Sequence, residues 1–227
     1  LSGSTNNTNS NFASVGDEDL FEHECNVGEV TRDNHPPNEV RLQIEGWHVT
    51  RLDSIGSTND ELVRRLETSD LPDRTVLVAD VQTAGRGRLD RRWEAPVGEN
   101  LLCSMLFRPP IAHPQHLQHA VALAILAATR HFDVGNVWLK WPNDVIVVEP
   151  DTSPRADYAK LAGMLSTMTA DGSVIIGAGV NINWSPVGAT SLATIAGHPL
   201  SVIDVLRALL SSLHDLLVCS EDELTDR

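Results

Sequence analysis

The sequence predicts an α+β domain, because several runs typical of strands follow one another directly and only some of them are separated by runs typical of helices. Residues 74–82 and 173–183 are rich in apolar and β-branched side chains, as strands are. Residues 114–132 instead carry apolar side chains at the spacing of one helix face. With 227 residues, of which 41% are hydrophobic, the chain is long enough to bury the core of one large domain, with or without an appendage.

The first segment differs in composition from the rest of the chain. Residues 1–41 are rich in Ser, Asn, Thr, Asp and Glu, and Pro36-Pro37 interrupts them. Such a composition buries little apolar surface, so we expect a flexible polar arm here and a folded domain over residues 42–227. The arm also lacks the paired amphipathic helices of a helix-turn-helix that reads DNA.

The folded domain is expected to begin with one or two strands over residues 40–55. A helix follows over residues 57–68, and Ser57 or Thr58 can cap its first turn. The free N–H groups and hydroxyls of a helix start can also bind a polar ligand. The cap and a ligand contact are therefore two compatible roles for the same residues.

Further strands are expected over residues 74–82, 100–107, 137–148, 160–169 and 173–183, and further helices over residues 114–132 and 201–219. The strand over residues 137–148 is interrupted at Pro142, because proline cannot sit inside a central strand. The resulting bend presents Asn143 and Asp144 at a strand edge or cleft. Asp171-Gly172 is a hairpin signal between the last two strands.

The charge balance and the cysteines restrict the classes of function. The formal net charge is -14, so the field of the whole molecule repels nucleic acid and anionic membrane, and any anion site must be local. Cys25, Cys103 and Cys219 are scattered without metal-type spacing, which fits reduced thiols without assigned chemistry. The sequence shows neither a membrane-spanning apolar run nor a secretion signal, so we expect a cytoplasmic protein.

Residues 81–93 are the most informative stretch, because four arginines fall within a few residues of one another in this acidic chain. Gly85 and Gly87 lie among them and let the backbone approach a ligand closely. Arginine forks bind carboxylate and phosphate bidentately, which indicates a mobile positive loop that grips and encloses an anion. A solvated charged turn is the alternative interpretation.

Two other groups of basic residues stand out. Lys140 and Lys160 are the only lysines among the 17 basic residues, and both lie beside motifs quoted below. His113, His116 and His119 fall on the start of one predicted helix. No carboxylate or cysteine accompanies these histidines, so we interpret them as solvated rather than as a metal site.

Five short motifs follow one another along the chain. They are Ser57-Thr58-Asn59, Gln82-Thr83-Ala84-Gly85-Arg86-Gly87-Arg88, Lys140-Trp141-Pro142-Asn143-Asp144, Lys160-Leu161-Ala162-Gly163 and Gly177-Ala178-Gly179-Val180-Asn181. In order and spacing they resemble the biotin protein ligase family, also called biotin–[acetyl-CoA-carboxylase] ligases, over about residues 57–213. The resemblance implies a central mixed β-sheet flanked by helices, related to the class II aminoacyl-tRNA synthetase fold. This agrees with the predicted elements.

The resemblance implies an ATP-dependent, AMP-forming ligase. Biotin's carboxylate attacks the α-phosphate of Mg-ATP, which gives biotinyl-5′-AMP and pyrophosphate, and a lysine of a biotin carboxyl carrier protein domain then takes the acyl group. Both partners of the first step are anions, so positioning and preorganised positive charge should supply most of the rate. The implied partners are biotin, ATP and the carrier domain of an acetyl-CoA or related carboxylase. Homodimerisation stays open, and neither nucleic acid nor membrane is expected.

Residue by residue, the family pattern places these side chains and glycines on biotin: Ser57, Thr58, Gln82, Gly85, Arg86, Arg88, Lys160 and Gly163. It places these on the nucleotide, with the indole stacking on adenine: Arg91, Trp93, Asn143, Ala178 and Asn181. Lys160, Arg86 and Arg88 are the implied catalytic residues, and Lys160 lies where the biotin carboxylate and the α-phosphate meet. No covalent nucleophile and no protein-bound metal are predicted. Phosphates and water are expected to hold Mg²⁺, with Asp144 as an outer-shell partner.

The sequence departs from the family pattern in two places. Leu89-Asp90 stands where the family usually has Gly, which stiffens the loop and adds a negative charge near the phosphates. We predict that Asp90→Gly tightens ATP or adenylate binding by up to about 1 kcal/mol. The chain also begins without Met and ends after a single helix, without the small C-terminal β-barrel of bacterial members. We therefore expect a fragment, or a member that lacks this domain.

Two other functions stay open at this stage. A lipoate or octanoate ligase shares the fold, although a different sequence is expected in its ligand loop. A non-catalytic module that binds biotin or biotinyl-AMP is the second alternative. Release of pyrophosphate that depends on biotin and ATP separates the enzyme from the binding module, and a comparison of biotin with lipoate separates the two ligases.

Overall fold

The structure, a computed structural model, describes residues 39–89, 91–148 and 158–225, with side chains described as far as residue 218. The strands are β1 (Glu39–Ile44), β2 (Trp47–Ile55), β3 (Thr75–Gln82), β4 (Leu101–Phe107), β5 (Val137–Lys140), β6 (Asp144–Val148), β7 (Tyr158–Met168) and β8 (Val174–Val180). The helices are α1 (Thr58–Thr68), α2 (Pro114–Arg130), α3 (Leu192–Ala196) and α4 (Val202–Thr225). Asp90 and residues 1–38 of the expected arm lie outside the described residues, and residues 39–41 belong to β1.

All eight strands form one sheet, in the order β1-β2-β3-β4-β8-β7-β6-β5. β2 and β3 run parallel and are connected through α1, whereas every other neighbouring pair runs antiparallel. The α+β class with a central mixed sheet is therefore confirmed. The pairing of β4 with β8 joins the first half of the chain to the second in the middle of the sheet.

Local sequence explains where the strands turn. Glu45 and Gly46 both have positive φ, 46° and 81°, which suits a two-residue hairpin turn and splits the predicted run of residues 40–55 into two strands. Gly172 has a φ of 83° in the predicted β7–β8 hairpin, where Asp171 Oδ1 accepts a hydrogen bond of 3.1 Å from the Ser173 N–H. The break at Pro142 is likewise confirmed, since it separates β5 from β6.

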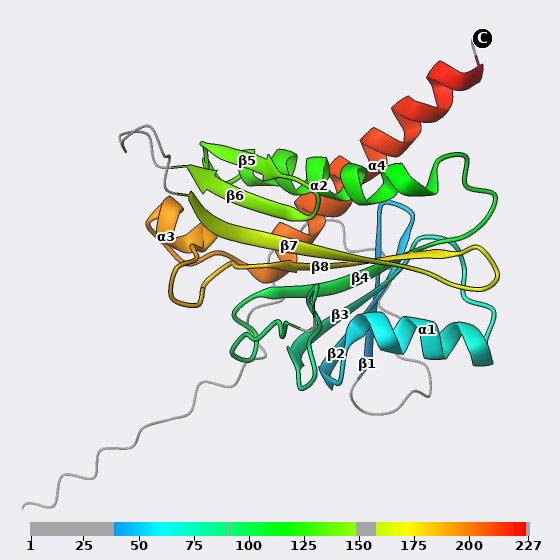
Figure 1. Ribbon diagram of the computed structural model, residues 1–227, viewed down its shortest axis with the longest axis horizontal. Helices are drawn as coiled ribbons and strands as arrows, with labels where there is room; N and C mark the ends of the chain where they lie inside the picture. Colours follow the sequence, from blue (N-terminus) through cyan, green and yellow to red (C-terminus); the bar gives the residue numbers. More distant parts are fainter. Residues whose placement is uncertain (1–38, 90, 149–157, 226–227) are drawn as a thin grey trace, which may run out of the picture.

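Helices cover both faces of the sheet (Figure 1). α2 and α4 lie together on one face, over the larger hydrophobic core, and α1 lies on the opposite face. The smaller core beneath α1 consists of Leu62, Leu77, Leu106 and Ile175. The short helix α3, which the sequence did not predict, is capped by Ser191 and ended by Gly197 with a φ of 80°.

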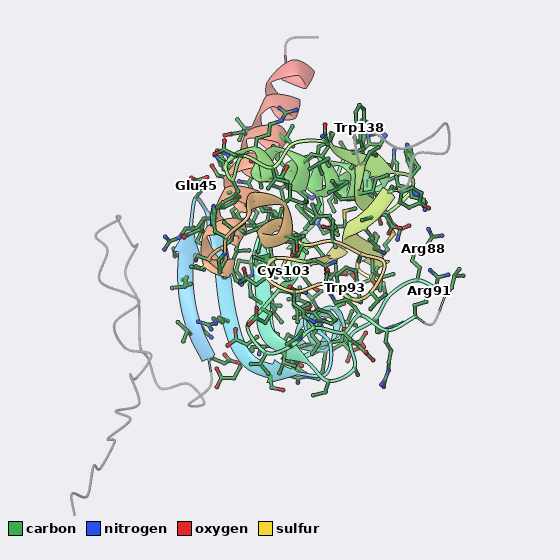
Figure 2. The ribbon with its side chains drawn as sticks, turned by 90° about the vertical axis from the view of Figure 1, so that its left-hand side faces the viewer. Glu45, Arg88, Arg91, Trp93, Cys103 and Trp138 are labelled. Carbon is green, nitrogen blue, oxygen red and sulfur yellow. The ribbon has the colours of Figure 1, made fainter. Side chains whose placement is uncertain are left out.

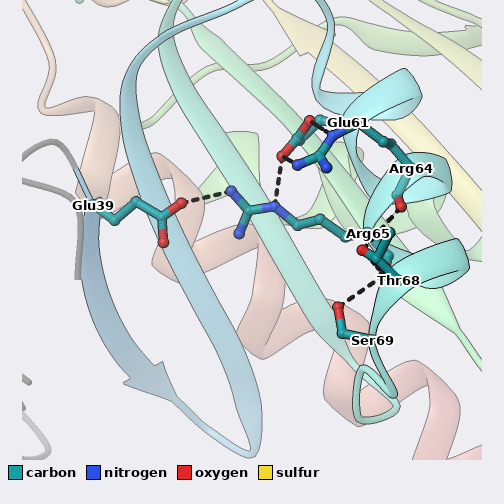
Figure 3. Close-up of polar contacts among 6 residues, drawn as sticks. All are labelled: Glu39, Glu61, Arg64, Arg65, Thr68 and Ser69. Carbon is teal, nitrogen blue, oxygen red and sulfur yellow. Dashed lines mark hydrogen bonds and ion pairs between the residues drawn. The ribbon is translucent and has the colours of Figure 1, made fainter. Parts of the chain in front are cut away.

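An ion-pair network ties α1 to the edge of the sheet (Figure 3). Arg65 lies 2.7 Å from Glu61 on the same helix and 2.6 Å from Glu39 on β1. Glu61 also accepts a hydrogen bond from Arg64, and the hydrogen bonds and charges of the two arginines lower the pKa of Glu61 to about 2. At the start of α1, next to this network, Ser57 is the N-cap and accepts a hydrogen bond from the Asp60 N–H, as predicted. The first turn of α1 is thus fixed in place beside β3.

Candidate functional site

A pocket opens between the first turn of α1, the end of β3 and the paired strands β7 and β8. Its lining consists of Ser57, Thr58, Asn59, Gln82, Arg86, Gly87, Arg88, Trp93, Cys103, Ser104, Asn143, Lys160, Gly163, Met164, Leu165, Gly177, Ala178 and Gly179. Every residue expected on biotin lines this pocket except Gly85. Of the residues expected on the nucleotide, Trp93, Asn143 and Ala178 line it, whereas Arg91 and Asn181 do not.

Hydrogen bonds fix the polar groups at the α1 end of the pocket. The Thr58 N–H donates to Gln82 Oε1 at 2.7 Å, and the Thr58 hydroxyl donates to the same oxygen at 3.1 Å. Because a backbone N–H can only donate, the amide oxygen of Gln82 must face Thr58, and its Nε2 donors point elsewhere. The Thr58 hydroxyl proton is already used, so the 2.8 Å contact with Ser104 Oγ is a bond that Ser104 donates.

Asn59 adds an acceptor to this end of the pocket. The side chain is buried, and its Nδ2 donates to the Leu165 carbonyl at 3.3 Å. Its Oδ1 is also buried, and it has no hydrogen-bond partner within the described part of the chain. Gly177 makes room for this amide, because a Cβ there would lie 3.0 Å from Asn59 Nδ2. A buried amide oxygen without a partner is costly, so this acceptor suits a donor on a ligand.

The arginine loop, residues 85–89 and 91–93 as the structure describes them, spans the pocket from α1 to the turn between β5 and β6. Arg86 Nη1 lies 2.7 Å from Asp60 Oδ1 on α1, and Arg88 Nη1 donates to Asn143 Oδ1 at 2.7 Å. Gly85 is structural here, because a Cβ would lie 2.2 Å from the Trp93 carbonyl oxygen. Arg91 is exposed, and Figure 2 shows Arg88 and Arg91 toward one edge of the molecule while Trp93 lies nearer its centre.

The indole of Trp93 lies on two glycines that are cross-strand partners, Gly163 on β7 and Gly179 on β8. A Cβ would lie 2.9 Å from the indole at Gly163 and 2.3 Å from it at Gly179, so only glycine permits this contact. Lys160 Nζ lies 5.4 Å from the centre of the indole, and Trp93 Nε1 is buried without a hydrogen-bond partner among the described residues. The glycine pair therefore forms a flat floor that accepts a planar ring.

Lys160 lies beside this floor and forms an ion pair with an acidic residue of β6. Its Nζ lies 2.7 Å from Asp144 Oδ1, at the start of β6. Asp144 does not line the pocket itself, although its neighbour Asn143 does. Arg86, Arg88 and Lys160 thus bring three cations to one pocket of an acidic chain, each held by an oxygen of another element. Such an arrangement suits a ligand that carries two anionic groups.

The remaining candidates lie apart from this chemistry. His113 and His116 are exposed on the first turns of α2, and the His119 ring lies 4.2 Å from that of Trp141. Within residues 39–89, 91–148 and 158–218, no group of three His, Cys, Asp or Glu side chains is placed to hold a metal. Burial raises the pKa of Cys103 to about 12, so this thiol is unreactive. Cys25 and the side chain of Cys219 lie outside the described residues.

Sequence reasoning did not assign a role to two residues at the α1 end of the pocket, Asn59 and Ser104. Asn59 directly follows Ser57 and Thr58 in one of the motifs, and this position could have indicated a ligand contact. Ser104 is fully buried and is the one hydroxyl in the otherwise apolar β4. A lone serine in a buried strand needs a polar partner, and this was a weaker signal. Of the described helices, none is long and apolar enough to cross a membrane.

Comparisons with known proteins agree with this geometry. The profile of the Biotin/lipoate A/B protein ligase family matches residues 52–183. The "Bifunctional ligase/repressor BirA" of Bacillus subtilis is 30% identical over 185 residues, which cover 75% of this chain and 54% of that protein. The "Biotin--[acetyl-CoA-carboxylase] ligase" of Mycobacterium tuberculosis is 34% identical over 150 residues, which cover 62% of this chain and 52% of that protein. The chain thus spans about half the length of these curated relatives.

Among solved structures, the biotin protein ligase of Aquifex aeolicus in complex with biotin and ATP is similar to this chain. The two superpose with a TM-score of 0.62 at 30% sequence identity, over 74% of this chain and 69% of the other.

Proposed function

Because the chain belongs to the Biotin/lipoate A/B protein ligase family, we propose that it is a biotin–protein ligase. In this proposal it activates biotin with ATP to biotinyl-5′-AMP and transfers biotin to a lysine of a biotin carboxyl carrier protein. The family includes lipoate ligases, so membership alone does not choose the substrate. The hydrogen-bonding groups at the α1 end of the pocket are the reason for proposing biotin as the substrate.

Those groups match the ureido ring of biotin, which has one carbonyl acceptor and two N–H donors. Gln82 Nε2 offers donors, because its amide oxygen is held by Thr58. Asn59 Oδ1 offers an acceptor that no described residue satisfies. The dithiolane of lipoate and the chain of octanoate offer no such groups, and each buried polar group left unpaired costs about 1–3 kcal/mol. A site built in this way rejects a ligand that lacks the polar groups.

The first reaction step follows from the charges in the pocket. A carboxylate oxygen of biotin forms a bond to the α-phosphorus of ATP while the bond from that phosphorus to pyrophosphate breaks. Lys160, Arg86 and Arg88 are proposed to offset the charge of both anions and to align them. No side chain has to form a covalent intermediate. In the second step the neutral amine of the carrier lysine attacks the acyl carbon, AMP leaves, and the amine loses a proton.

The nucleotide is proposed to bind beside Trp93, Asn143 and Ala178, which line the pocket, with Arg91 and Asn181 as further expected contacts from the sequence. In the structure the Trp93 indole covers Gly163, a residue expected on biotin, so the indole has to move before both ligands fit. Mg²⁺ is proposed to be coordinated by the phosphates of the nucleotide and by water. Asp144 fits an outer-shell role at most, since Lys160 already holds one of its oxygens.

The test is pyrophosphate release by the purified chain. We expect release only when biotin and ATP are both present, and less than about 1% of that rate when lipoate or octanoate replaces biotin. Equal rates with lipoate would establish the lipoate-ligase alternative instead. Biotin binding without pyrophosphate release would identify a binding module. Transfer to the carrier is followed by mass spectrometry of the acceptor lysine. The carrier and a cytoplasmic location are parts of the proposal, homodimerisation stays open, and neither nucleic acid nor membrane is a proposed partner.

A further inference from the structure

The direction of the Lys160 side chain depends on an irregularity in β7. Across β6, Gly163 pairs with Asp144 and Ala162 pairs with Val145, but the next partner of β6 is Lys160, so that Leu161 is skipped. Strict alternation from Gly163 would turn Lys160 toward the larger core, away from the pocket. Instead Leu161 and Ala162 are both completely buried in that core. The extra residue is a β-bulge, and it returns Lys160 to the pocket face.

A bulge leaves main-chain groups that the neighbouring strand cannot pair, and here Asn181 pairs them. The Asn181 N–H donates to the Leu161 carbonyl at 2.9 Å, and Asn181 Nδ2 donates to the Lys160 carbonyl at 3.3 Å. The Thr190 N–H donates to the same Lys160 carbonyl at 3.0 Å. Asn181 therefore contacts both carbonyls at the place where the register shifts.

The Asn181 amide is fully used inside the protein. Its Nδ2 also donates to the Thr190 carbonyl at 3.0 Å, and its Oδ1 accepts from Asn100 Nδ2 at 3.4 Å. The residue is 2% exposed and does not line the pocket. A nucleotide contact would require some of these bonds to break, whereas a supporting role requires none to change.

We propose that Asn181 is a positioning residue, which holds the β7 bulge and thereby aims Lys160 at the two reacting anions. The inference deepens the proposed function, because Lys160 is the residue through which Asn181 acts. It differs from the nucleotide contact expected for Asn181 from the sequence. Asp144 holds the far end of the same side chain, 2.7 Å from Nζ, so Lys160 is fixed at its backbone and at its ammonium.

The first measurement does not depend on activity. Lys140 and Lys160 are the only lysines of the chain, so a protein labelled with ¹³C,¹⁵N-lysine gives only two side-chain signals, which Lys140→Arg assigns. In Asn181→Ala we expect the Lys160 signal to move or broaden while the Lys140 signal stays in place. Asn183→Ala is the matched control, because among the described residues the Asn183 amide bonds only to the backbone of Leu200. An unmoved Lys160 signal in a folded Asn181→Ala protein overturns the proposal.

The second measurement is a double-mutant cycle with Lys160→Met on the rate of biotinyl-AMP formation. Asn181→Ala should lower kcat about tenfold or more in the wild-type background, since small errors of placement are costly. It should change the KM for ATP less than about twofold, and lower the rate less than about twofold when Lys160 is already Met. A nucleotide contact predicts the reverse, namely weaker ATP binding in both backgrounds. If the wild type forms no biotinyl-AMP, the proposed function fails, and the lysine signals still decide the role of Asn181.

Discussion

At the scale of single residues, the Thr58 N–H sets the orientation of the Gln82 amide. A hydroxyl can donate or accept, and an amide can be turned around, but a backbone N–H has one role. The Thr58 hydroxyl therefore donates its proton to Gln82, and the Ser104 hydroxyl donates to Thr58. The ligand meets donors where Gln82 lies and an acceptor where Asn59 lies. Substitutions that keep shape and change only donors or acceptors test this arrangement most directly.

Gln82→Glu replaces the amide donors by an acceptor of almost the same shape. We expect biotin affinity to fall roughly a hundredfold, because the ureido carbonyl would then face a carboxylate oxygen. The affinity for ATP should change far less. Titration calorimetry measures both. Gln115→Glu, on the exposed start of α2, has the same charge change and should leave both affinities unaltered. Similar biotin affinity in Gln82→Glu would contradict the assigned direction of the amide.

Lys160→Arg keeps the charge and changes the shape of the cation. Lys160 Nζ lies 2.9 Å from the position of a Cβ on Gly163, so the wider guanidinium has little room beside the floor. We expect adenylation to slow by roughly a hundredfold or more, with a smaller effect on biotin affinity. Pre-steady-state formation of biotinyl-AMP at saturating ligands is the measurement. Lys140→Arg serves as the control, and near-equal rates for wild type and Lys160→Arg would remove Lys160 from its central role.

At the scale of elements, the arginine loop and α1 carry the contacts that hold the pocket together. The loop is held by an ion pair of Arg86 at one end and a hydrogen bond of Arg88 at the other. Both arginines are expected to bind the ligand, so each must exchange a protein partner for a ligand group. The Trp93 indole must leave the glycine floor in the same process. Ligand binding therefore has to rearrange the whole segment from Gly85 to Trp93.

This exchange predicts a change in protease sensitivity. Glycine and clustered like charge oppose a single loop structure, so trypsin should cleave after Arg88 or Arg91 in the protein without added ligands. Biotin together with ATP should suppress the cleavage. Lipoate with ATP is the control pair and should protect much less. The same cleavage rate with and without biotin and ATP would show that the loop does not close over a ligand.

The ion pairs of α1 predict an acid-dependent part of the stability. The pKa of Glu61 is about 2 in the folded protein, below its ordinary value of 4.5, so folding favours the charged carboxylate. The stabilisation is complete above about pH 4.5 and disappears as the pH falls from 4.5 toward 2. Glu61→Gln should therefore be less stable than wild type near pH 7, by up to about 1 kcal/mol for partly exposed pairs.

The difference between Glu61→Gln and wild type should shrink across that acidic range in urea unfolding curves. Glu67→Gln is the matched control, because Glu67 is exposed on the same helix. A difference that stays constant with pH would mean that the network does not depend on the charge of Glu61.

At the scale of the whole molecule, the sequence predicted the order of elements and most of the pocket. Runs of apolar and β-branched residues located every described strand, and ten of the residues that the sequence placed on the ligands line the pocket. It missed α3, which is too short to show a period and depends on the Ser191 cap and on Gly197. It also missed Ser104 and the β7 bulge, because both depend on which strands become neighbours. Register between distant strands is a tertiary property that a local pattern does not contain.

The pairing of β4 with β8 also determines when the pocket can exist during synthesis of the chain. Thr58, Gln82 and the arginine loop emerge from the ribosome well before Lys160 and Gly179, and the β4–β8 register is the strand pairing that joins the two groups. Such long-range pairing is slow to form because a long loop must close first. A nascent chain that ends before β8 therefore has one wall of the pocket and, under the proposed function, cannot hold biotin there. Biotin capture would mark the moment at which the central sheet is complete.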